Sequence, residues 1–169
     1  DLDDIMPTAL LSSTFFVASL VHVPLGPGSV HLVLSGLLGI ILGWASFPAI
    51  LIALLLQAVF FQFGGLTVLG VNTVVIAVPA VFCSYLISPW LEQEKTRPSA
   101  AFVAGILSIL LSSLLMALVL GLSDQGFAAT AKIILAANLP IMLIEGCISM
   151  FIIDFLAKVQ PEILHLESV

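Results

Sequence analysis

Histidine and amide side chains stand out in the first half of this chain because nearly every residue around them is apolar. From Ile5 to Leu91 the sequence contains no Asp, Glu, Lys or Arg. The imidazole and amide side chains within this stretch are those of His22, His31, Gln57, Gln62 and Asn72. Such groups are costly in an apolar medium unless they contact one another, backbone groups or a ligand, so they are the first candidates for a functional site.

His31 is the strongest candidate for binding a metal ion. It follows a rigid Pro/Gly turn in Val23-Pro-Leu-Gly-Pro-Gly-Ser-Val-His31. A neutral imidazole is a good ligand for Co²⁺, Ni²⁺, Cu²⁺ or Zn²⁺. The alternative is a structural histidine that hydrogen-bonds a turn carbonyl, and residue types alone favour that alternative. His22 could join His31 at a site or be an ordinary histidine at the membrane interface.

Several polar neighbours could orient a metal-bound imidazole without binding the metal. Metal sites usually need such surrounding hydrogen-bonding groups. The candidates for this role are His22, Ser29, Gln62 and Asn72. Gln57 and Gln62 could equally bridge helices through amide hydrogen bonds, and Asn72 could satisfy free backbone groups.

Two acidic residues lie inside the last apolar segment. Asp154 precedes Lys158 by four positions, the spacing of an ion pair on a helix. Glu145 lies deeper, where a hydrogen bond to a neighbouring helix is favoured over a proton or ion relay. The sequence has no phosphate-binding loop, zinc-protease histidine pair or serine elbow. We therefore assign no catalytic residue and do not expect an enzyme.

The elements that must position these side chains are membrane-spanning helices. Hydrophobic residues make up 61% of the 169 positions, charged residues 8%, and the mean hydropathy is +1.29. Long apolar runs suit a hydrocarbon solvent. The pattern predicts an all-α polytopic membrane helix bundle, a single transmembrane domain over 1–169, with helices at 7–23, 30–45, 47–63, 66–88, 98–122 and 127–158. The formal net charge of −6 excludes nucleic acid as a partner.

The few cations predict how the bundle is oriented. Lys95, Arg97 and Lys158 are expected on one side of the membrane, which the positive-inside rule makes the cytoplasmic side, with Lys132 as the exception. With six crossings, the turn at 26–31 then faces outward. Small residues four apart, such as those in the fifth expected helix, are expected to serve mainly internal packing, although some could face another membrane subunit.

Two segments resemble a known family of membrane proteins. They are Val23-Pro-Leu-Gly-Pro-Gly-Ser-Val-His31-Leu-Val-Leu-Ser-Gly36 and Leu56-Gln57-Ala-Val-Phe-Phe-Gln-Phe-Gly64-Gly65-Leu-Thr67-Val-Leu-Gly70-Val-Asn72. Leu139-Pro140 to Glu145-Gly146 and Val159-Gln-Pro161-Glu162-Ile-Leu resemble the last helix and tail of the same family. It is the CbiM/NikM family, the substrate-capture subunits of energy-coupling-factor cobalt and nickel importers. The resemblance covers nearly the whole chain.

The resemblance implies capture of Co²⁺ or Ni²⁺ from the outer side of a bacterial or archaeal cell (inner) membrane. The metal is transported, and no resident cofactor is expected. The implied partners are a membrane coupling subunit, two cytoplasmic ATPase subunits and often a small accessory membrane protein. Family members bind the metal with the terminal amine, the next backbone nitrogen, a histidine at the second position and a further histidine, which matches His31.

The start of the chain departs from the family. It begins Asp1-Leu2, so the family's Met-His terminal segment and first helix have no counterpart, and we expect seven helices in the complete family member. Two other functions stay open. One is a membrane scaffold or assembly subunit without metal binding; the other is a channel or secondary transporter, which would need a charged relay or internal repeats. The residues do not choose between cobalt and nickel.

Overall fold

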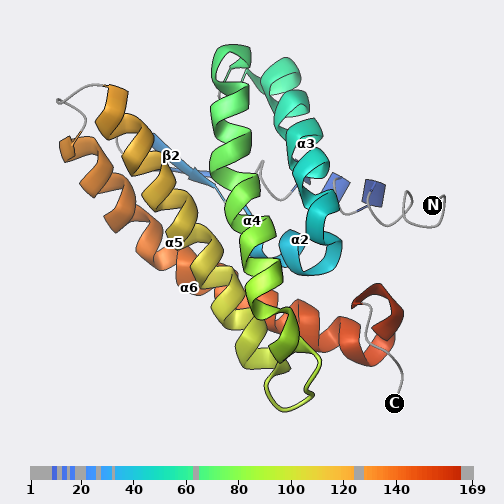
Figure 1. The fold of residues 1–169 in the computed structure, drawn as a ribbon. Helices are drawn as coiled ribbons and strands as arrows, with labels where there is room; N and C mark the ends of the chain where they lie inside the picture. The colour runs from blue at the N-terminus through green and yellow to red at the C-terminus, as the bar shows by residue number, and fades with distance from the viewer. Residues whose placement is uncertain are drawn as a thin grey trace.

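Apolar helices and one short β-hairpin make up the fold. The structure, a computed structural model, describes residues 9–10, 13–14, 16–17, 22–25, 28–31, 33–62, 65–123 and 128–164. The strands are β1 (His22–Leu25) and β2 (Gly28–His31); the helices are α2 (Ser35–Leu42), α3 (Ser46–Phe61), α4 (Leu69–Leu91), α5 (Arg97–Ser123) and α6 (Ala128–Val159), with 3₁₀ turns η1 (Gly43–Ala45), η2 (Leu66–Val68) and η4 (Pro161–Leu164). Figure 1 shows α5 and α6 as a long antiparallel pair beside the pair α3 and α4.

Four helical stretches in the described part of the chain are long and apolar enough to cross a membrane. They are Ser35–Phe61, Leu66–Leu91, Arg97–Leu122 and Lys132–Val159. The prediction of a polytopic helical membrane protein is confirmed. The prediction of six spans is wrong over the described residues, because α2, η1 and α3 together form one apolar stretch and a hairpin precedes them.

The hairpin explains the difference at the start of the chain. The expected helix 30–45 begins only at Ser35, because β2 precedes it. The expected helix 7–23 lies partly outside the described residues, and from His22 onward the chain forms β1. Hydropathy does not distinguish a short apolar strand from an apolar helix, whereas a two-residue connection rich in Gly and Pro favours a hairpin.

Helix α2 is short and central. Gly43 ends it with φ +52°, a backbone conformation that favours glycine, and the chain changes direction through η1 into α3 (Figure 1). Leu38 of α2 packs with Ile50 of α3 in one buried cluster. Leu37 packs in a second cluster that includes Ile153 of α6. Helix α2 therefore joins the two helix pairs.

Two glycines allow helix backbones to touch. A Cβ placed on Gly36 would lie 2.7 Å from the carbonyl oxygen of Ala104, so the start of α2 packs directly against α5. A Cβ on Gly105 would lie 2.8 Å from the carbonyl oxygen of Glu145, so α5 packs directly against α6. Small residues permit such close approach between membrane helices. The expected use of small residues in internal packing is confirmed at Gly105.

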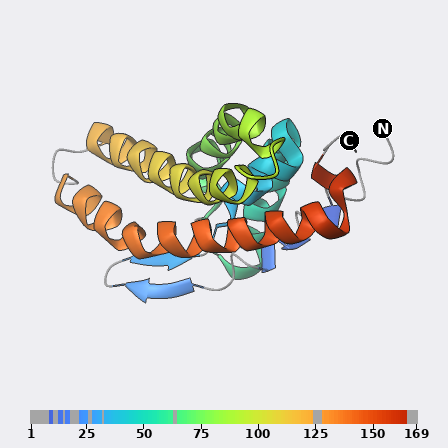
Figure 2. The same cartoon turned by 90° about the horizontal axis from the view of Figure 1, so that it is seen from below.

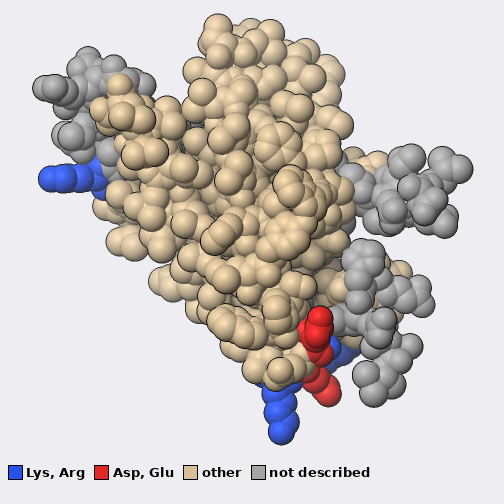
Figure 3. Space-filling view, viewed as in Figure 1, with Lys and Arg blue, Asp and Glu red and all other residues tan. Residues whose placement is uncertain are grey.

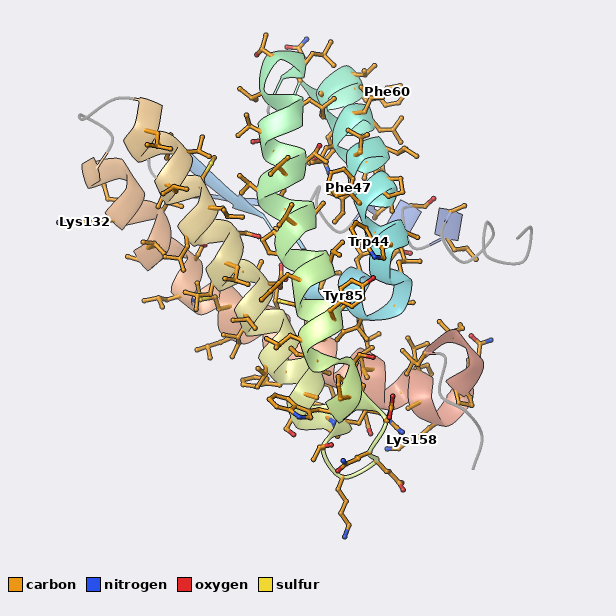
Figure 4. All side chains as sticks on the ribbon, in the orientation of Figure 1. Trp44, Phe47, Phe60, Tyr85, Lys132 and Lys158 are labelled. Carbon is orange, nitrogen blue, oxygen red and sulfur yellow. The ribbon has the colours of Figure 1, made fainter. Side chains whose placement is uncertain are left out.

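Charged side chains gather at one end of the described structure. Figure 3 shows this group of blue and red side chains, and Figure 4 labels Lys158 of α6 at the same end and Lys132 toward the other end. Arg97 Nε donates a hydrogen bond to the Leu91 carbonyl oxygen at 2.9 Å, which holds this turn together. Asp154 and Lys158 form the expected ion pair, at 2.7 Å. The turn with Lys95 and the start of α5 with Arg97 thus lie at the same end of the described structure as Lys158, and the assignment of that end to the cytoplasm stays a prediction.

Large apolar side chains cover the outside of the helices. Figure 4 shows them projecting from α3, α4, α5 and α6. Phe60 is 69% exposed, and the rings of Trp44 and Tyr85 meet edge to face with centroids 6.1 Å apart. An exposed apolar surface of this extent marks contact with a membrane. The outer faces of the helices therefore suit lipid.

One hydrogen bond between α5 and α6 gives a measurable contribution to stability. Asn138 Nδ2 donates to Ser113 Oγ at 2.8 Å. We expect Ser113→Ala to lower the free energy of unfolding by about 1 kcal/mol, because the Asn138 amide loses its partner between two helices. The measurement is unfolding by SDS titration in mixed micelles. Ser112→Ala is the matched control, since Ser112 Oγ is buried with no hydrogen-bond partner among the described residues. An equal loss in both variants would contradict the prediction.

Candidate metal site

The hairpin brings the two histidines of the first half of the chain opposite each other. His22 is the first residue of β1 and His31 is the last residue of β2. The antiparallel register pairs His22 with His31 and Pro24 with Ser29. The structure describes the backbone of these residues, and their side chains lie outside the described part. Residues paired in an antiparallel ladder have Cα atoms about 4.5–5.5 Å apart, so the register places both histidines at the open end of the hairpin.

The hairpin lies beside α6, away from the end of the bundle that carries the charged group. In Figures 1 and 2 it runs along the N-terminal half of α6, and its connecting end points toward the end of the bundle that carries Lys132. His31 lies at the other end of the strand, close in sequence to the start of α2. The histidine pair is therefore set back from the hairpin tip, toward the middle of the bundle.

Glu145 fixes the backbone that follows His31. Its Oε1 accepts hydrogen bonds from the backbone N–H groups of Val33 and Leu34, the latter at 2.9 Å. The Glu145 side chain is fully buried, and its Oε2 has no hydrogen-bond partner among the described residues. The sequence favours a structural hydrogen bond from Glu145 to a neighbouring helix; the structure shows such bonds, and they go to the two residues that directly precede α2.

The sequence does not identify the backbone N–H groups of Val33 and Leu34 as the partners of Glu145. Val33 and Leu34 are apolar, and their side chains give no sign that their backbone groups contact Glu145. The available signal was indirect: a carboxylate deep in a membrane helix must find donors, and the free N–H groups before a helix are donors of that kind. Leu34 also has φ +50°, a left-handed conformation that an apolar residue type does not predict.

The structure places Gln62 and Asn72 around the turn between α3 and α4. Gln62 follows the last residue of α3 with φ +57° and is exposed. Asn72 lies in the first turn of α4 and is half-buried. Over the described residues, no hydrogen bond joins either side chain to the hairpin. Gln57 is only 5% exposed and lies on the buried side of α3.

Among the described residues, the other ionisable side chains do not gather into a metal-binding site. In the part of the chain that the structure describes, no group of three or more His, Cys, Asp or Glu side chains could hold a metal ion. Structural and transport sites for transition metals normally supply three or four ligands. The histidine pair of the hairpin therefore remains the candidate around which such a site would form.

The described residues include four helical stretches long and apolar enough to cross a membrane. With the histidine-bearing hairpin and the buried Glu145 carboxylate, they define a multi-pass membrane protein with a polar centre. The family model described as CbiM, cobalt uptake substrate-specific transmembrane region, matches residues 1–163. The chain belongs to this family, whose members take part in transport rather than catalysis.

Similar proteins carry names that agree with this family. A protein of Haemophilus influenzae named "Putative metal transport protein" is 42% identical over 162 residues, covering 94% of this chain and 79% of that protein. The Cobalt transport protein CbiM of Sorangium cellulosum is 29% identical over 166 residues, with 92% and 74% covered. A protein of Archaeoglobus fulgidus named "Putative fused nickel transport protein NikMN" is 29% identical over 161 residues, with 92% and 54% covered. No solved structure matches the chain.

Proposed function

We propose that this protein is the substrate-binding membrane subunit of an ATP-driven importer and that it captures Co²⁺ or Ni²⁺ from the outer side of the cell membrane. The observation that carries the proposal is the match of residues 1–163 to a cobalt-uptake, substrate-specific membrane region. Relatives named for cobalt and for nickel transport support the same pair of metals.

The histidine-bearing hairpin is the proposed place of capture. His31 is the proposed ligand, because imidazole nitrogen binds both Co²⁺ and Ni²⁺ well. His22, paired with it in the register, and Ser29, also in β2, are the nearest candidates to surround the metal. Gln62 and Asn72 stay candidates for the same supporting role from the α3–α4 turn. The other ligands would come from outside the described residues.

The charge distribution supports the proposed direction of transport. Three of the four cations gather at one end, which the positive-inside rule assigns to the cytoplasm. The hairpin tip points toward the opposite end (Figure 1). We assign ATP hydrolysis to two cytoplasmic partner subunits, reached through a membrane coupling subunit, with a small accessory membrane protein as a further partner.

Metal retention by the isolated protein tests the proposal. The complete natural polypeptide, purified in detergent, is dialysed to equilibrium against Co²⁺, Ni²⁺ or Mg²⁺. We expect about one Co²⁺ or Ni²⁺ per chain and no Mg²⁺, because nitrogen ligands favour the later transition metals whereas Mg²⁺ prefers oxygen ligands. A membrane scaffold would retain none of the three ions. Absence of bound Co²⁺ and Ni²⁺ in a folded preparation would overturn the proposal in favour of the scaffold.

A further inference from the structure

Glu145 makes its hydrogen bonds at the junction between the histidine-bearing strand and the first helix of the bundle. Its partners, the N–H groups of Val33 and Leu34, come two and three residues after His31 and directly before Ser35, where α2 begins. A single carboxylate oxygen therefore holds the end of β2 and the start of α2 to α6, more than a hundred positions along the chain.

The junction needs an acceptor of this kind. N–H groups at the start of a helix have no partner within the helix, and leaving them unpaired in apolar surroundings is costly. The same end of a helix carries a partial positive charge, which a carboxylate complements. Leu34 is 7% exposed and adopts φ +50°, a conformation that its surroundings must impose. Glu145 supplies the acceptor that stabilises this turn of the chain.

Glu145 is itself held in place by backbone packing. Its carbonyl group and the adjacent Gly146 lie against Gly105 of α5, at a distance that leaves no room for a Cβ on Gly105. Gly36, two residues after Leu34, lies against Ala104, one residue before Gly105. Glu145, the first turn of α2, and α5 around residues 104 and 105 therefore pack against one another. A shift of one of them would move the others.

We propose that Glu145 is a positioning residue for the metal site. By accepting hydrogen bonds from the backbone N–H groups of Val33 and Leu34, it determines the position of the nearby His31. This inference rests on the proposed function of His31 as a metal ligand. The distance between a metal and its ligands tolerates only a few tenths of an ångström, so a ligand on a short strand needs the backbone next to it in sequence to be anchored. Glu145 is that anchor, and it acts through the backbone N–H groups of Val33 and Leu34.

Five variants of the complete polypeptide test the proposal by Co²⁺ affinity, the ligand-field absorption spectrum of bound Co²⁺, and the melting temperature without metal. Glu145→Gln keeps a carbonyl oxygen for both N–H groups, and we expect its affinity within about threefold of the original and an unchanged spectrum. Glu145→Leu removes the acceptor, and we expect an affinity at least about tenfold weaker with an altered spectrum, the size of effect seen when supporting groups at metal sites are lost.

Glu145→Asp keeps a buried carboxylate but is one methylene shorter, so it remains informative if Glu145→Leu does not fold. We expect Glu145→Asp to weaken Co²⁺ binding and change the spectrum, because the shorter side chain must lose one of its two bonds or pull the junction toward α6. The structural control is Ser113→Ala, which removes a hydrogen bond between α5 and α6 and leaves both hydrogen bonds of Glu145 in place. It should lower the melting temperature and leave the affinity and spectrum unchanged.

The outcomes separate this inference from the proposed function. If His31→Ala retains the original affinity, His31 is not a ligand and the proposed site fails. If His31→Ala loses the metal while folded Glu145→Leu or Glu145→Asp retains the original affinity and spectrum, the capture function stands and the positioning role of Glu145 is overturned. Equal weakening in Glu145→Gln and Glu145→Leu would also overturn it, since a hydrogen-bond acceptor would then not be sufficient.

Discussion

His31→Ala is expected to weaken Co²⁺ and Ni²⁺ binding by the complete polypeptide by at least about 100-fold, equivalent to about 2.7 kcal/mol of binding free energy. Loss of groups that merely surround a metal costs about 10- to 100-fold in affinity, and loss of a direct ligand should cost no less. Binding should be measured by equilibrium dialysis with metal analysis, and the melting temperature without metal should stay close to the original because His31 ends a four-residue strand.

Histidine controls make this prediction specific. His165→Ala removes an imidazole from the C-terminal tail of the sequence and should leave the affinity unchanged. His22→Ala removes the residue paired with His31 in the hairpin and should weaken binding by about tenfold if it supports the site. An affinity for Co²⁺ that survives in His31→Ala and falls in His165→Ala would place the metal elsewhere in the chain.

Gly105→Val is expected to destabilise the bundle by about 3 kcal/mol or more, enough to remove most of the folded protein from a detergent preparation. The atoms that its Cβ would meet are the Glu145 carbonyl oxygen and the Gly146 Cα, both at 2.8 Å. These are backbone atoms, so no side chain can turn aside to make room. α5 and α6 would have to separate, and the junction held by Glu145 would move with them.

Gly121→Val is the matched control for Gly105→Val, because it makes the same substitution in the same helix. A Cβ on Gly121 would meet nothing within 4 Å. Its free energy of unfolding should stay within about 0.5 kcal/mol of the original, as for most surface substitutions. Unfolding by SDS titration and the yield of monodisperse protein in gel filtration measure both variants. Similar stability in the two would show that α5 and α6 do not touch at Gly105.

Membrane character and the main polar residues could be predicted from the sequence because hydrocarbon imposes simple rules. The absence of charge from Ile5 to Leu91 predicts spanning helices, and the positions of Lys95, Arg97 and Lys158 predict that these cations share one end. A deep acid such as Glu145 must find hydrogen-bond donors, so its structural bond could be expected although its partners could not.

The hairpin and the shortened α2 could not be predicted by the same rules. Hydropathy reports how apolar a segment is, and the residues around His22 and His31 are apolar whether they form a helix or strands. The difference depends on pairing between segments and on a contact to Glu145 from the far end of the chain. The positions of Gln62 and Asn72 also depend on how α3 and α4 pack. Their closeness in one sequence motif does not predict that packing.

The uneven distribution of basic residues has a consequence for biosynthesis. Of the four lysine and arginine residues of this sequence, only Lys132 lies toward the end of the bundle opposite the charged group, so the proposed orientation requires one basic side chain to cross the hydrocarbon. Within this sequence, the proposed orientation then depends on three basic side chains. The identity of Lys95, Arg97 and Lys158 therefore bears on how the nascent chain inserts as well as on the folded protein.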